Sequence, residues 1–132
     1  MKVAIGTDDK RTIRKSHFYG SRYFLVIEIL NAQVVAKELR NNTYVEAEKA
    51  KEDQGQTERV INLLKDCSLF MARSFGRRSV LEISSCGIDC ITTDIENINQ
   101  AISSYLDGQV KGFEYFDRDA KAFMPCTQRA FK

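Results

Sequence analysis

The sequence has little of several features that mark specialised classes of protein. A single proline among 132 residues excludes a proline-rich linker or a collagen-like chain. Twenty basic and 18 acidic side chains leave a formal charge of +2, which argues against a strongly basic surface that binds nucleic acid. The longest apolar run, Tyr23 to Ile27, is strand-sized and far short of the ~18 residues of a membrane span. No signal-peptide pattern follows Met1, so we expect a cytoplasmic protein.

Cysteine and histidine are also scarce. Four cysteines without a Cys-x-x-Cys pair do not suggest a disulfide scaffold, and in the cytosol we expect them to be reduced. Cys86 and Cys90 are four positions apart, a poor match to common zinc or iron–sulfur spacings. Because His17 is the single imidazole, a mixed cysteine–histidine zinc site is hard to assemble. Most of the cysteines are expected to be buried, with Cys86 and Cys126 as candidates for exposure.

The hydrophobic pattern indicates one folded domain that alternates between strands and helices. A hydrophobic fraction of 43% argues against disorder, and the length fits a single core. Apolar periodicity predicts strands over 2–5, 23–29, 33–39, 68–72 and 88–92. It also predicts helices that begin at Thr57, span 77–86, and run from an N-cap at Asp94 to a stop at Gly108. In the second helix Val80, Leu81 and Ile83 are expected to face partly inward.

This order of elements predicts an α/β fold. The two strands over 23–29 and 33–39 are joined by Asn31 and Ala32, so they should pair antiparallel. Strands that alternate with helices in the second half should be parallel, with right-handed crossovers. We therefore expect a central mixed sheet flanked by helices. Beyond Gln109 no clear period is present; Phe113, Tyr115 and Phe116 could add an edge strand, and the last ten residues are expected to be loosely held.

The carboxyl ends of the parallel strands should bring three loops together, over residues 7–19, 73–78 and 92–95. Basic side chains outnumber the others in these loops, although the whole chain is nearly neutral. A positive field beside the N–H groups of a helix start attracts anions. The sequence therefore predicts an anion-binding rim, unless these cations are simply solvated loop residues.

Three further features each have a functional and a structural interpretation. His17 could ligate a metal or cluster through a ring nitrogen, or be an ordinary surface histidine. Asp8, Asp9 and Asp94 could hold a divalent metal for a phosphohydrolase or nuclease, or could form turns and caps. The charged segment 41–56 could bind a protein partner, or be a solvated connection or a short solvated helix.

Three stretches carry a resemblance to a known family; they read MKVAIGTDD, HFYGSRYFLVIEI and GQTERVINLLKDCSLFMARSFGRRSVLEISSCGIDCITTD. In their order they resemble the dinitrogenase iron–molybdenum cofactor biosynthesis family, which includes NifX, NifY, NafY and the C-terminal part of NifB. The resemblance covers residues 1–108. Residues 109–132 would form a C-terminal extension that packs on the same domain or trails from it.

The resemblance implies a ribonuclease-H-like three-layer fold and a role without catalysis. Family members bind, carry or hand over an iron–molybdenum cofactor or its iron–sulfur precursor. His17 matches the histidine of the family's His-Phe-Gly motif, which is a candidate cluster ligand. Residues 73–76 are similar to the Arg-Asn-Phe-Gly turn of cofactor-binding members. Tyr19 stands where the family has glycine, and its bulk could narrow the pocket.

We therefore expect a metallocluster at the loop edge. His17 would ligate it, with Cys86 or Cys126 as weaker candidates. The rest of the expected binding set comes from one turn: Arg73, Ser74, Phe75, Gly76, Arg77 and Arg78. Its arginines would balance the cluster's negative charge, and its glycine would let the backbone approach. The expected partners are the cluster and a protein that donates or accepts it; neither a membrane nor nucleic acid is expected as a partner.

Overall fold

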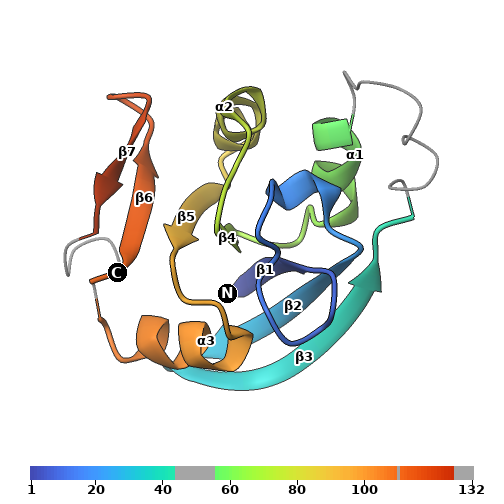
Figure 1. Cartoon of the computed structure of the whole chain (residues 1–132), viewed down its shortest axis with the longest axis vertical. Coiled ribbons are helices and arrows are strands. Elements are labelled where there is room, and N and C mark those ends of the chain that lie inside the picture. Colours follow the sequence, from blue (N-terminus) through green and yellow to red (C-terminus); the bar gives the residue numbers. More distant parts are fainter. Residues whose placement is uncertain (44–55, 110, 127–132) are drawn as a thin grey trace.

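The computed structural model describes residues 1–43, 56–109 and 111–126, in which helices flank a mixed seven-stranded sheet (Figure 1). The strands lie in the order β3-β2-β1-β4-β5-β6-β7. They are β1 Lys2–Thr7, β2 Tyr23–Leu30, β3 Gln33–Asn41, β4 Leu69–Ala72, β5 Asp89–Thr93, β6 Phe113–Asp117 and β7 Ala122–Pro125. The helices are α1 Gln56–Leu63, α2 Arg77–Ser85 and α3 Ile98–Leu106, with a short 3-10 helix, η1, at Phe18–Gly20. The predicted α/β class with a mixed sheet is confirmed.

The centre of the sheet is parallel and both sides are antiparallel. β1, β4 and β5 run in the same direction, whereas β2 and β3 on one side and β6 and β7 on the other form antiparallel pairs. Asn31 and Ala32 join β2 to β3 with φ angles of 52° and 60°. Two consecutive residues in the left-handed region match the twist of the flanking strands and fix their antiparallel register.

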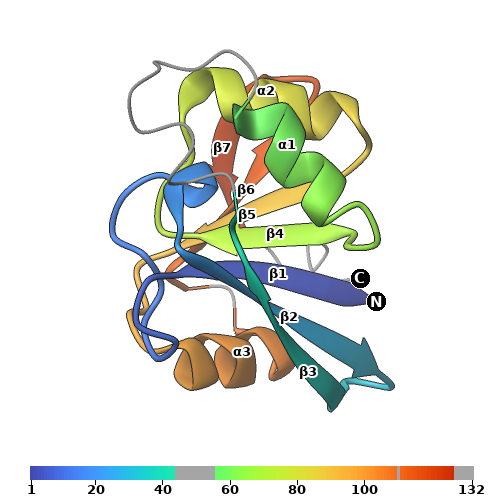
Figure 2. The same cartoon turned by 90° about the vertical axis from the view of Figure 1, so that its right-hand side faces the viewer.

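Helices cover both faces of the sheet, as Figure 2 shows: α1 and α2 lie on one face and α3 lies on the other. The chain therefore leaves β4 toward one face and leaves β5 toward the opposite face. In open α/β sheets, strand ends whose connections diverge in this way leave a crevice where ligands bind. The carboxyl ends of β4 and β5 form such a point.

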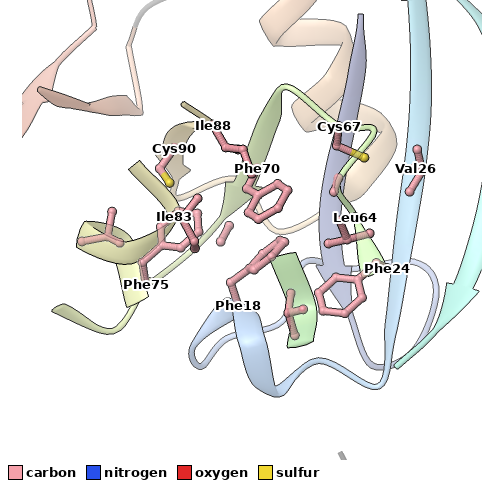
Figure 3. Close-up of a cluster of buried hydrophobic side chains, with 14 residues drawn as sticks. Phe18, Phe24, Val26, Leu64, Cys67, Phe70, Phe75, Ile83, Ile88 and Cys90 are labelled. Atoms are coloured by element: carbon pink, nitrogen blue, oxygen red, sulfur yellow. The ribbon is translucent and has the colours of Figure 1, made fainter. Parts of the chain in front are cut away.

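A cluster of phenylalanines fills the face under α1 and α2 (Figure 3). Phe18 stands at its centre, with ring centroids 4.8 Å from Phe70, 5.0 Å from Phe24 and 5.4 Å from Phe75. Since Phe18 and Phe70 are almost fully buried, the first residue of η1 is anchored in the core. The residue before it, His17, is held at the surface by that anchor.

Several predicted details are wrong. α3 starts at Ile98, because Asn97 caps it by accepting a hydrogen bond from the Gln100 N–H at 2.9 Å; Asp94 does not cap it. Leu81 points outward with 41% of its surface exposed.

The C-terminal region also departs from the expectation. The aromatic run does form β6, but residues 122–125 add a further strand, β7, where a loosely held end was expected. Of the two cysteines considered as candidates for exposure, Cys86 is exposed and Cys126 is buried. No helix among the described residues is long and apolar enough to cross a membrane. The segment 41–56, considered as a partner-binding region, lies mostly outside the described residues.

Candidate functional site

His17 lies directly beside the arginine-bearing turn that follows β4. The two segments form an isolated parallel bridge between His17 and Ser74, in which the Phe18 N–H donates to the Ser74 carbonyl at 3.1 Å. The side chains also meet, with the imidazole Nδ1 3.1 Å from the Ser74 hydroxyl oxygen. The imidazole is exposed and stacks on the ring of Tyr19, with centroids 5.9 Å apart and planes inclined by 19°. The structure thus brings together two predicted site residues that are 57 positions apart.

The loop that carries His17 is held by polar contacts at the end of β1, one of them buried. The Ser21 hydroxyl is fully buried and donates to the Phe18 carbonyl at 2.8 Å. Gly6 lies so close to Ser21 that a Cβ at position 6 would collide with this hydroxyl. Arg14 donates from Nε to the His17 carbonyl at 3.1 Å and pairs with Asp8 at 2.7 Å. These contacts fix the backbone of η1 and hence the place of the imidazole.

The three arginines of the turn differ in their surroundings. Arg73 has a side chain that is 26% exposed and pairs with Glu96 at 3.4 Å. Arg77 and Arg78 are exposed and occupy the first two positions of α2. The N-cap of this helix is Gly76, which has no side chain to bond the first N–H groups. Two exposed arginines therefore lie at the positive end of a helix whose first N–H groups have no side-chain cap.

Phe75 and Gly76 of the same turn differ in what they contribute to the fold. Phe75 is buried and packs against Phe18, so it anchors the turn in the core. Gly76 has φ −64° and ψ 145°, an extended conformation open to any residue. A Cβ there would meet Tyr19 Cε1 and the Ser79 hydroxyl at 3.6 Å, an ordinary contact distance. The backbone of the turn therefore does not require glycine at this position.

Two of the three carboxylates considered for a divalent metal, those of Asp8 and Asp9, are engaged in other contacts. Asp9 accepts hydrogen bonds from the N–H groups of Arg11 and Thr12 and from the Thr12 hydroxyl. These bonds hold the pKa of Asp9 well below its usual range and make it the cap of its own turn. Asp8 pairs with Arg14, and Asp94 lies against Gly112. Among the residues that the structure describes, no three or more His, Cys, Asp or Glu side chains gather as a metal site.

A cavity of about 560 Å³ opens next to Arg73, at the carboxyl ends of β4 and β5. Its other walls come from the end of β5, the start of β6 and the end of β7: Thr92, Thr93, Asp94, Lys111, Gly112, Phe113, Glu114, Pro125 and Cys126. The sequence did not predict that the start of β6 and the end of β7 line this cavity. A possible edge strand was expected over Phe113, Tyr115 and Phe116, but without a place in the sheet, and no pattern indicated β7.

The cysteines occupy separate places. Cys126 lines the cavity, whereas the exposed Cys86 follows the last turn of α2. At about 1.5 Å per residue, nine helical residues put Cys86 about 13 Å from the helix start beside Tyr19. Burial raises the pKa of Cys126 to about 11, so its thiol stays protonated near neutral pH.

Because Cys86 is exposed and the other three cysteines are buried, we predict selective alkylation of Cys86 in the folded protein. Burial raises the pKa of Cys67 to about 11 and that of Cys90 to about 12, which leaves almost no reactive thiolate at pH 7.5. We expect iodoacetamide to modify Cys86 first, as read by mass spectrometry of peptides. In urea all four thiols should react. Equal rates at Cys86 and Cys90 in the native protein would contradict the packing described above.

Known proteins share both the sequence and the fold. The family model described as dinitrogenase iron-molybdenum cofactor matches residues 1–108. The uncharacterized protein MJ0580 of Methanocaldococcus jannaschii is 25% identical over 114 residues, which cover 86% of this chain and 92% of that protein. The crystal structure of PH0822 has a TM-score of 0.67 and 25% identity, and covers 82% of this chain and 92% of its own. The apo form of the orange protein from Desulfovibrio gigas has a TM-score of 0.65 at 18% identity, over 82% and 88% of the two chains.

Proposed function

Because the chain belongs to the dinitrogenase iron-molybdenum cofactor family, we propose that it is a non-catalytic protein that binds and carries an anionic iron–molybdenum or iron–sulfur cluster. The cluster is the cargo of the protein, and its seat is the rim formed by His17 and residues 73–78. The observation that carries this proposal is the contact between the imidazole of His17 and Ser74. It joins the single histidine of the chain to the turn that bears the arginines.

The chemistry of the rim suits such a cargo. A neutral imidazole nitrogen is a good ligand for iron and other transition metals. Arg77 and Arg78 supply charge-assisted N–H donors to a sulfur-rich anion, and the uncapped start of α2 adds backbone donors. Arg73 is shared between the rim and the adjacent cavity. One imidazole and a set of cations suit a carrier, since a cluster with few protein ligands can be passed on.

The remaining sequence-based predictions fit this proposal. Helices on both faces of a mixed sheet support the ribonuclease-H-like class that the resemblance implies. We propose residues 1–108 as the cluster-binding domain and residues 109–132 as its C-terminal extension. The pairing of β6 with β5 and of β7 with β6 supports packing of this extension on the same domain. The partner is a protein that donates or accepts the cluster, and the site of action is the cytoplasm.

Anaerobic reconstitution tests the proposal. The purified protein is incubated with ferrous iron, sulfide and molybdate under a reductant, and then passed over a desalting column. We expect a sulfur-to-metal charge-transfer band in the visible spectrum, and iron and sulfide that coelute with the protein. Protein that elutes without metal or a visible band, under conditions in which a known cluster-binding protein is loaded, would overturn it.

Substitution of Gly76 by alanine separates folding from cargo binding. The structure has room for a Cβ at this position and an ordinary φ angle, so stability should change by less than about 1 kcal/mol. If the cargo approaches the backbone of the turn, the same methyl group should reduce cluster retention several-fold. Thermal unfolding and metal analysis of the reconstituted variant give the two values. Unchanged retention would show that the cargo does not contact this turn at Gly76.

A further inference from the structure

The imidazole of His17 is held in one orientation before any cargo arrives. Its backbone is fixed by the bridge to Ser74 and by the Arg14 hydrogen bond to its carbonyl. Its side chain then has two contacts on different parts of the ring, the Nδ1 edge against Ser74 and one face against Tyr19. Surface histidines usually sample several rotamers, and these contacts remove much of that freedom.

Ser74 acts on one particular atom of the ring. Its hydroxyl oxygen lies 3.1 Å from Nδ1, so Nδ1 and not Nε2 is the nitrogen engaged with the protein. The Ser74 hydroxyl can accept a hydrogen bond from Nδ1–H or donate one to an unprotonated Nδ1, and a neutral imidazole carries its lone pair on Nε2 in the first case only. When Nδ1 keeps its proton and donates it to a hydroxyl, Nε2 is left free to bind a metal.

Tyr19 acts on the face of the ring. The two rings are nearly parallel, inclined by 19°, with centroids 5.9 Å apart. The tyrosine ring also reaches the turn, because its Cε1 lies 3.6 Å from the place that a Cβ of Gly76 would occupy. Tyr19 therefore packs between His17 and the start of α2 and limits rotation of the imidazole. Tyr19, which stands where the resembling family has glycine, thus contacts both the imidazole and the turn.

We propose that Ser74 and Tyr19 are positioning residues that hold His17 as the Nδ1–H tautomer and present Nε2 as the ligating atom. This inference rests on the proposed function for its purpose, but it concerns a property of the protein without cargo. Neither residue needs to touch the cluster. In the proposed arrangement the Ser74 hydroxyl accepts the hydrogen bond from Nδ1–H, and Tyr19 holds the plane of the ring.

Nitrogen NMR of the unloaded protein tests the tautomer directly. With one histidine in the chain, a single set of ring ¹⁵N signals is expected and needs no assignment. At pH 8, where an ordinary imidazole is neutral, the wild type should show mainly the Nδ1–H pattern. Ser74→Ala should move the signals toward the Nε2–H pattern, and Ser74→Thr, which keeps a hydroxyl, should restore them. A wild type with mainly Nε2–H, or signals unchanged in Ser74→Ala, would overturn the role of Ser74.

The role of Tyr19 is tested with a matched pair of variants. Tyr19→Phe keeps the aromatic face and should leave the imidazole signals close to those of the wild type. Tyr19→Leu removes the ring, and the imidazole proton shifts should approach those of a free histidine side chain. Identical shifts in Tyr19→Leu and the wild type would show that the stacking does not hold the ring.

Cluster retention then separates this inference from the proposed function. Outer partners of metal-bound histidines typically alter metal affinity by about 10- to 100-fold, and we expect Ser74→Ala to weaken retention in that range. Wild-type protein that binds a cluster but shows the Nε2–H tautomer would refute the positioning role and leave the proposed function standing. Wild-type protein with the Nδ1–H tautomer and no cluster binding would refute the proposed function alone.

Discussion

Replacement of Phe18 by alanine should lower the free energy of unfolding by about 3–5 kcal/mol. The side chain is 1% exposed and its ring packs against the rings of Phe24, Phe70 and Phe75. Its removal leaves a cavity at the centre of the aromatic cluster, and it also frees η1 from the core. Urea denaturation followed by circular dichroism measures the loss.

Leu81→Ala is the control for this prediction, because Leu81 is a large apolar residue that the structure leaves 41% exposed. Its removal should cost much less than the removal of Phe18. Similar losses for the two variants would show that η1 is not anchored in the core as described. A loss below about 1 kcal/mol for Phe18→Ala would show the same, since such values are typical of exposed positions.

The double substitution of Arg77 and Arg78 by glutamine should weaken binding of a molybdenum–sulfur anion by at least about tenfold. A hydrogen bond to a charged group contributes about 1.5–3 kcal/mol, and one factor of ten corresponds to 1.4 kcal/mol. Both arginines are exposed, so the fold of the double variant should be the same as that of the wild type. Titration with the tetrathiomolybdate dianion, followed by its visible absorption, gives the dissociation constant. Binding to the wild type should also weaken as salt is raised.

Arg118→Gln, compared with Arg77→Gln alone, is the control for the loss of one positive charge. Arg118 follows β6 and pairs with Asp89 at the start of β5, which places it at the opposite edge of the sheet from the rim. This variant loses one positive charge without changing the rim, so its affinity should stay within about twofold of the wild type. Equal weakening by Arg118→Gln would mean that total charge, and not the rim, governs binding.

The sequence predicted the regular part of the fold well, for physical reasons that particular elements show. β1, β4 and β5 are short apolar runs next to turn residues, and α2 and α3 each have one apolar face, so periodicity alone located them. α3 was placed too early, because Asp94 and Asn97 are both good cap residues and only the folded chain shows which one accepts the Gln100 N–H. β7 was missed because four residues with no alternation carry no strand signal.

The sequence predicted that the His17 loop and the arginine-bearing turn would lie together, but not how they would make contact. The rule that ligands bind at the carboxyl ends of parallel strands brought the His17 loop and the 73–78 turn to one edge. Their contact through Ser74 depends on a bridge between segments far apart in the sequence, which no local pattern encodes. The resemblance marked Gly76 as a point of close approach, whereas the structure shows an ordinary backbone there. From the sequence, the bulk of Tyr19 was considered as a feature that could narrow the pocket; in the structure its ring stacks on the imidazole of His17.

The most direct test of a cluster seat at His17 is a comparison of His17→Ala with the wild type in anaerobic reconstitution, with circular dichroism to verify that both are folded. His17 is exposed and its side chain carries no core contact, so the variant should fold normally. We predict that the wild type retains iron, sulfide and a visible charge-transfer band after desalting, and that His17→Ala loses most of all three. Equal metal content and an identical band in the two proteins would contradict the account.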